Sequence, residues 1–323
     1  MNNALRRTLA ALTAAAAAAT IAVACTPKPA NAAETANYST ALAVTTLQAV
    51  EASGLTPVLR LPARTMAKGE RILLTARLAG TSNATMYPRM AVRLDAISGA
   101  TILRSPVKSI NHDGKAYGVQ AVALRWLLTA PVDGTYAITM RGEATTYLNT
   151  ATTRLTIDPA MTYLKASTVG QKSIQWGETA EDCVGRVNHP APDVAACKTK
   201  RTSTSALPKT ITRPTGVKAV TVVGDVELSR EYGSYPGGSS KVNVSLTVNV
   251  RTSTGKVCAT KTVTKTGLVI TSRKHHFHQQ LTASSVPTTC GGKITTAVKV
   301  THVSGNPVGI HGEKESNGIA LMG

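Results

Sequence analysis

The stretch Lys241–Thr252, which reads KVNVSLTVNVRT, decides the fold class. Its apolar residues occupy every second position, and polar residues fill the positions between them. Successive side chains of a β-strand point to opposite faces, so this pattern predicts a strand with one buried and one solvent-facing side. The turn-forming sequence Ser253–Lys256 follows and leads into a second expected strand, Val257–Thr264, which predicts a hairpin.

The same alternation recurs along the chain, in segments separated by Gly, Pro, Asn and Asp. Further strands are expected at Arg71–Leu78, Met90–Ala96, Tyr117–Leu128, Thr135–Arg141 and Lys293–Val303, with a last one at the apolar tail Ile319–Met322. Evidence for a helix is confined to Thr40–Glu51, where a strand fits equally well. The sequence therefore predicts an all-β protein with two β-sandwich domains, immunoglobulin-like or jelly-roll-like.

The segment Ala130–Tyr136, APVDGTY, supports this fold class. Pro presets φ and Gly accepts a positive φ, so the segment is expected to turn into the strand that begins at Thr135. It resembles a turn-to-strand segment of many bacterial secreted immunoglobulin-like modules, in which the Tyr packs at a corner of the sandwich. The resemblance implies the fold and carries no chemistry.

The first 32 residues have the layout of a bacterial secretory signal peptide. Arg6 and Arg7 precede an uncharged, Ala-rich run, and Ala30–Ala32 supplies the small residues of a cleavage site. Cleavage after Ala32 predicts a secreted, extracellular protein. The uncharged run is short for a bilayer span and none follows it, so no transmembrane segment is expected in the mature protein.

A lipid anchor is the alternative for the N-terminus. The sequence Ala22–Cys25 resembles a bacterial lipoprotein signal, although Ala stands where Leu is usual. The resemblance implies that Cys25 becomes a lipidated N-terminus and holds the protein on the outer face of the cytoplasmic membrane.

Beyond the signal peptide we expect a sandwich domain at 33–170, a disulfide-closed loop and linker at 171–205, and a second sandwich domain at 206–323. Four cysteines remain after Cys25 is set aside, an even number that favours disulfides in an exported chain. Pairing of sequence neighbours predicts Cys183–Cys197 and Cys258–Cys290. The cysteine spacings match no zinc module.

Charge and aromatic content limit the classes of ligand. The chain has 36 Lys and Arg against 17 Asp and Glu, and loss of residues 1–32 lowers the formal charge from +19 to +16. Only 3% of the residues are aromatic, which disfavours a ring-stacking site for sugars or single strands and a sequence-specific reader of nucleic acid. The classes of ligand that remain are anionic polymers of the cell envelope and a protein partner. The expected polyanion-binding residues are Lys198, Lys200, Arg201, Arg273 and Lys274.

The sequence Lys274–His278, KHHFH, is the densest group of metal-ligating residues. On a strand, His276 and His278 share one face, and a metal site there needs further ligands. His302, with His311 as the alternative, is the expected third ligand. Ordinary histidines on a solvated strand are the competing interpretation.

No sequence motif of catalysis occurs: nucleophile elbow, zinc-protease helix, phosphate loop and dinucleotide fingerprint are all missing. Asp225 and Glu227 share a strand face, and we expect them to pair with basic residues; a calcium-binding or acid–base role is the alternative. The sequence therefore favours an exported, non-catalytic binding protein of the cell envelope or extracellular space, without a cofactor. The alternatives are a metal-dependent hydrolase built on the histidines and an assembly subunit that pairs through edge strands.

Overall fold

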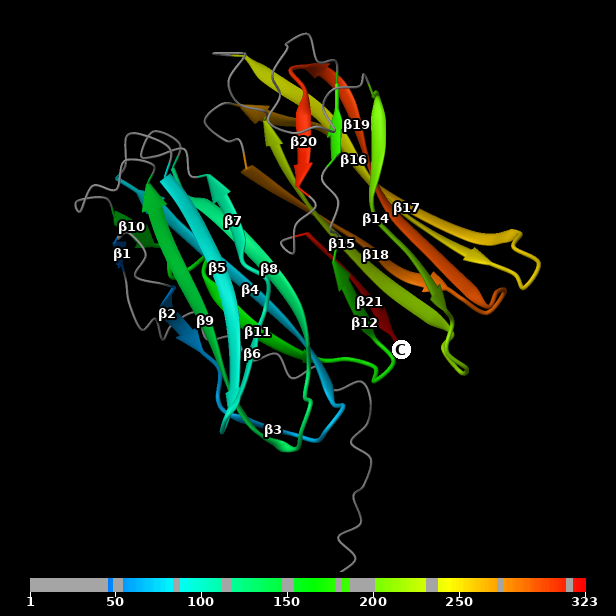
Figure 1. Cartoon of the computed structure of the whole chain (residues 1–323), viewed down its shortest axis with the longest axis horizontal. Coiled ribbons are helices and arrows are strands. Elements are labelled where there is room, and N and C mark those ends of the chain that lie inside the picture. The colour runs from blue at the N-terminus through cyan, green and yellow to red at the C-terminus, as the bar shows by residue number, and fades with distance from the viewer. Residues whose placement is uncertain are drawn as a thin grey trace, which may run out of the picture. The chain divides into compact units, whose positions relative to one another are not determined.

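Antiparallel β-strands make up the regular secondary structure in the described part of the chain (Figure 1). The computed structural model describes residues 46–48, 55–83, 88–111, 118–146, 154–177, 182–185, 201–230, 238–271, 276–311 and 316–323. The strands form four sheets, and every strand pair in them is antiparallel. The all-β prediction is confirmed.

Sheets 1 and 2 contain the strands of the N-terminal half. Sheet 1 has the order β1-β10-β4-β11, with β8 also on β4, and consists of β1 (Thr46–Gln48), β4 (Arg71–Ser82), β8 (Gln120–Thr129), β10 (Arg154–Ile157) and β11 (Tyr163–Thr168). Sheet 2 has the order β2-β9-β5-β6, with β3 on β9 and β7 on β5, and consists of β2 (Thr56–Arg60), β3 (Arg64–Met66), β5 (Pro88–Ser98), β6 (Thr101–Arg104), β7 (Lys108–Asn111) and β9 (Gly134–Thr146).

Sheets 3 and 4 contain the remaining strands. Sheet 3 has the order β12-β21-β15-β20-β13, with β18 on β15, and consists of β12 (Ile174–Gly177), β13 (Asp182–Val184), β15 (Ala219–Arg230), β18 (His276–Pro287), β20 (Val308–His311) and β21 (Asn317–Met322). Sheet 4 has the order β14-β19-β16-β17 and consists of β14 (Ser203–Thr212), β16 (Ser239–Arg251), β17 (Val257–Thr271) and β19 (Lys293–Gly305).

The first core lies between sheets 1 and 2, as in a β-sandwich. The inward set of β4 is the predicted one, with Ile72, Leu74, Ala76 and Leu78 fully buried. Tyr136 is also fully buried, and its hydroxyl donates a hydrogen bond to the carbonyl oxygen of Val132 at 2.9 Å. This bond closes the corner before β9, which agrees with the packing that the Ala130–Tyr136 resemblance implied.

The second core lies between sheets 3 and 4. All five apolar residues that alternate along β16 are buried in it: Val242, Val244, Leu246, Val248 and Val250. Trp176 packs against this core from β12, and its indole N–H donates to the carbonyl oxygen of Leu207 at 3.3 Å. The opposite face of β16 is left to solvent, as the alternation predicted.

A third, smaller cluster joins sheets 1 and 3. Leu127 of β8 packs there with Val223 of β15 and Ile319 of β21. Arg125, which neighbours Leu127 on the same face of β8, donates a hydrogen bond to the Thr282 hydroxyl at 2.9 Å. Residues of the N-terminal half therefore cover part of the outer face of sheet 3, and the described residues belong to one compact unit.

The structure contains strands whose bounds the sequence analysis did not predict, among them β15, and it differs from the expected bounds at two further places. β17 extends to Thr271, seven residues beyond the expected Thr264, and the segment 171–205 contributes β12, β13 and the start of β14. β12 and β13 are only four and three residues long, and strands this short leave little periodic signal. The predicted signal peptide, with Ala32 and the alternative anchor Cys25, lies outside the described residues. Among the described residues, no helix could cross a membrane.

Candidate functional site

The outer face of sheet 4 is cationic. The odd-numbered residues of β16 point away from the core, and the strand register places Lys293 beside Arg251 and Lys299 beside Ser245. Four basic side chains lie on this surface, which we call the basic face: Lys241, Arg251, Lys293 and Lys299. The four strands of sheet 4 contain no Asp or Glu. No carboxylate of its own sheet therefore neutralises the basic face.

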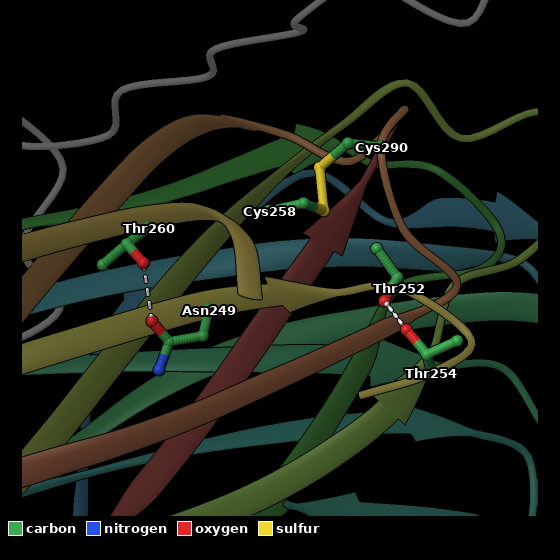
Figure 2. Close-up of a disulfide and its surroundings, with 6 residues drawn as sticks. All are labelled: Asn249, Thr252, Thr254, Cys258, Thr260 and Cys290. Atoms are coloured by element: carbon green, nitrogen blue, oxygen red, sulfur yellow. Dashed lines mark hydrogen bonds between the residues drawn. A yellow bond between two sulfur atoms is a disulfide. The ribbon is translucent and has the colours of Figure 1, made fainter. Parts of the chain in front are cut away.

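Hydroxyl and amide groups lie between these cations, together with the exposed Val257 beside Arg251 and the exposed Val269 beside Lys241. The polar groups come from all four strands: Ser203, Ser205, Thr210, Thr212, Asn243, Ser245, Thr247, Asn249, Thr260, Thr262, Thr264, Thr295 and Thr301. Cross-strand pairs order some of them. The Thr260 hydroxyl donates a hydrogen bond to Asn249 Oδ1 at 2.8 Å (Figure 2). The hydroxyls of Thr247 and Thr262 lie 3.2 Å apart. The strands of sheet 4 have no Phe, Tyr or Trp. This surface offers charge and hydrogen bonds, without a stacking platform.

A disulfide holds one end of the basic face. Cys258, near the start of β17, is bonded to Cys290 in the turn before β19, with Cα atoms 6.0 Å apart (Figure 2). Both cysteines are exposed. Cys183 is disulfide-bonded too, while Cys197 lies outside the described residues, so the Cys183–Cys197 pairing stays a prediction.

A second group of charged residues is buried on the opposite side of this half, on the outer face of sheet 3. Val222, Val226 and Leu228 of β15 point into the second core, so Asp225 and Glu227 point the other way, toward the N-terminal half. On β18 the register places His278 opposite Glu227 and Gln280 opposite Asp225. Asp225 is fully buried and Glu227 is 1% exposed.

The distances show a chain of alternating charges, which we call the buried charge cluster. Lys108 Nζ lies 3.3 Å from Asp225 Oδ2, and His278 Nδ1 lies 3.6 Å from Asp225 Oδ1. His278 Nε2 lies 3.2 Å from Glu227 Oε2, and His276 Nδ1 lies 2.7 Å from Glu227 Oε1. The Gln280 amide donates to Asp225 Oδ2 at 3.4 Å. Each buried carboxylate thus has cationic or polar partners, as burial of charge requires.

The same contacts shift two pKa values. Burial alone would raise the pKa of Asp225, but Lys108, His278 and Gln280 stabilise the carboxylate and lower it overall. Burial alone would lower the pKa of His278, but its contacts with Asp225 and Glu227 outweigh that effect and raise it to about 9. His278 is therefore a protonated, buried imidazolium at neutral pH.

Lys108 comes from the other half of the chain. It belongs to β7, is fully buried, and reaches across to β15 beside the third hydrophobic cluster. Asn317 of β21 adds a hydrogen bond from its side-chain N–H to the carbonyl oxygen of Arg125 at 3.3 Å. The buried charge cluster therefore helps to bind sheet 3 to the strands of the N-terminal half.

The structure places the predicted metal ligands in two groups. His276 and His278 both lie on β18 and share one face, as expected. His302 belongs to sheet 4, where its Nε2 lies 3.0 Å from the carbonyl oxygen of Asn306, so it does not join them. His311 of β20, the other residue considered, stacks on His276 with ring centroids 4.9 Å apart.

Of the predicted polyanion-binding residues, only Arg201 is described. Its guanidinium lies 2.9 Å from Asp182 Oδ1, so a carboxylate partly neutralises its charge. Lys198, Lys200, Arg273 and Lys274 lie outside the described residues. The basic face could not be predicted from local sequence, because its lysines are separated in sequence and meet only through strand pairing. The absence of acidic residues from 238–271 was the available signal.

Comparison with known proteins does not identify a family for this chain. No protein-family model and no curated protein matches the chain. Among solved structures, a tandem carbohydrate-binding module, CBM22-1-CBM22-2 of Paenibacillus barcinonensis Xyn10C, aligns over 90% of this chain and 92% of its own, at 12% identity and a TM-score of 0.24. The infectious bursal disease virus Gx strain aligns over 89% and 70%, at 8% identity and a TM-score of 0.29. These TM-scores are too low to transfer a fold or a function.

Proposed function

We propose that this protein is an exported, non-catalytic binding protein that holds a linear anionic polymer of the cell envelope on the basic face. The observation that carries the proposal is a solvent-facing sheet surface with four cations, many hydroxyl groups and no acidic residue in any of its strands. A polymer with repeated negative charges is attracted to such a surface and releases its counterions on binding. Hydroxyl and amide groups then donate hydrogen bonds to its oxygens.

Two observations support export. Residues 1–32 have the layout of a signal peptide. The Cys258–Cys290 disulfide is exposed, and exposed disulfides persist mainly in oxidising compartments outside the cytoplasm.

Binding to immobilised dextran sulfate, with neutral dextran as the reference polymer, tests the proposal. The variant Lys241→Gln, Lys293→Gln, Lys299→Gln removes three exposed cations of the basic face. The control Arg60→Gln, Lys68→Gln, Arg89→Gln removes three exposed cations of the N-terminal half. Both variants lose the same net charge, so they separate binding at one face from attraction by the whole protein.

We expect the wild-type protein to bind dextran sulfate and not neutral dextran. Loss of three contacts of about 0.5–1 kcal/mol each predicts affinity at least roughly tenfold lower for the basic-face variant. The control variant is expected to stay within about threefold of wild type, since only long-range attraction changes. Equal losses in the two variants would contradict a binding site on the basic face.

A further inference from the structure

Three metal-ligating side chains meet on adjacent strands at the outer face of sheet 3. Glu227 lies on β15, the central strand, with β18 on one side and β20 on the other. His311 is directly opposite Glu227 in the register, and His276 is one diagonal step away on β18. The potential ligand atoms of these three residues all lie within 4.8 Å of one another. We propose that Glu227, His276 and His311 bind a divalent transition metal ion, with Zn²⁺ as the expected ion.

The donor set suits zinc. Two imidazoles and one carboxylate supply three of the four ligands of a tetrahedral Zn²⁺ site, and leave one position for water or an exchangeable ligand. Bonds of about 2.0–2.1 Å place tetrahedral donors about 3.3 Å apart. The present separations, at most 4.8 Å, require only small side-chain movements.

The surroundings hold Glu227 in position for this role. His278 contacts its Oε2 at 3.2 Å, which leaves Oε1 on the side of His276. The backbone N–H of Glu227 donates to the Ser316 hydroxyl at 3.3 Å, and that hydroxyl donates to the carbonyl oxygen of His311 at 2.8 Å. Ser316 therefore ties two of the three ligand-bearing strands together. Such outer contacts orient metal ligands in known sites.

Access also differs between the histidines. The side chain of His276 is 29% exposed, so an ion can enter from solvent on that side. His278 is 5% exposed, and each of its nitrogens faces a carboxylate, Nδ1 toward Asp225 and Nε2 toward Glu227. His278 therefore orients Glu227 instead of binding the ion, and His311, the alternative to His302 in the sequence analysis, is the second histidine ligand beside His276.

Titration of the purified protein with Co²⁺, followed by competition with Zn²⁺, tests the site. Tetrahedral Co²⁺ gives visible absorption bands, and we expect them to saturate at one ion per chain and to disappear when Zn²⁺ displaces it. His276→Gln and His311→Gln each remove one ligand from a partly exposed position. His302→Gln, a half-buried histidine of sheet 4, is the matched control.

We expect each ligand variant to lose at least roughly tenfold in Zn²⁺ affinity, because a two-ligand site rarely holds the ion. The His302→Gln variant should bind within about twofold of wild type. Circular dichroism and thermal unfolding without metal verify that each variant is folded. The proposal is overturned if wild-type protein shows no tetrahedral Co²⁺ spectrum, or if His311→Gln binds as tightly as wild type. Neither result bears on polymer binding, which concerns sheet 4.

Discussion

The basic face of sheet 4 and the buried charge cluster of sheet 3 use the same strand alternation for opposite purposes. Both lie on the outer side of one sandwich, and both put charged residues at alternate positions. On the basic face the charges have one sign and meet water. In the buried charge cluster Lys108, Asp225, His278 and Glu227 have both signs and are nearly inaccessible. What covers a strand face, rather than its pattern, decides whether its charges face water or pair with one another.

The largest expected change in the free energy of unfolding follows removal of the buried cation, Lys108. Lys108→Met leaves the fully buried Asp225 without its lysine partner, and breaking a buried ion pair on one side costs about 3–5 kcal/mol. We expect the free energy of unfolding in urea to fall by that amount. Lys68→Met, at an exposed position, is the control and should change it by less than about 0.5 kcal/mol.

A double variant sharpens this prediction. Lys108→Met with Asp225→Asn should recover part of the lost stability, because a neutral amide no longer needs a counterion. A single variant Lys108→Met as stable as Lys68→Met would show that the two regions do not differ as argued.

The next effect is a pH dependence of stability that belongs to His278. Its pKa is about 9 in the folded protein and 6.5 in the reference state, so protonation favours the fold. This contribution, on the order of 3 kcal/mol, is fully present below about pH 6.5 and is lost as the pH rises through about 9. The measurement is the difference in unfolding free energy between wild type and His278→Gln from pH 6 to 10, with EDTA present. A difference that stays constant over this range contradicts the charged state of His278.

Much of the fold follows from local pattern, whereas the sites depend on long-range pairing. The alternation along β4 and β16 predicted their buried residues, and the sequence-neighbour rule suggested the Cys258–Cys290 disulfide that the structure contains. The spacing of Asp225 and Glu227 predicted that they share a strand face and pair with basic residues. Their partner Lys108 lies far away in sequence and carries no local signal. His311 was considered as a ligand from the sequence, but only the strand register shows that it lies opposite Glu227.

The smallest expected change in the free energy of unfolding comes from substitutions on the basic face. Lys241→Gln, Lys293→Gln and Lys299→Gln together should change the free energy of unfolding by less than about 1 kcal/mol, because exposed charges without partners contribute little to it. Urea unfolding of this triple variant and of Lys108→Met, measured side by side, compares the two regions directly. A loss as large as that of Lys108→Met would mean that the basic face is structural.

The salt dependence of dextran sulfate binding tests the central claim most directly. Counterion release makes the logarithm of the affinity fall linearly with the logarithm of salt concentration, by a slope of roughly one for each cation engaged. We predict a steep slope for wild type, a slope smaller by about 2–3 for Lys241→Gln, Lys293→Gln, Lys299→Gln, and a wild-type slope for Arg60→Gln, Lys68→Gln, Arg89→Gln. Binding that does not weaken with salt, or identical slopes in all three proteins, would contradict polymer binding at the basic face.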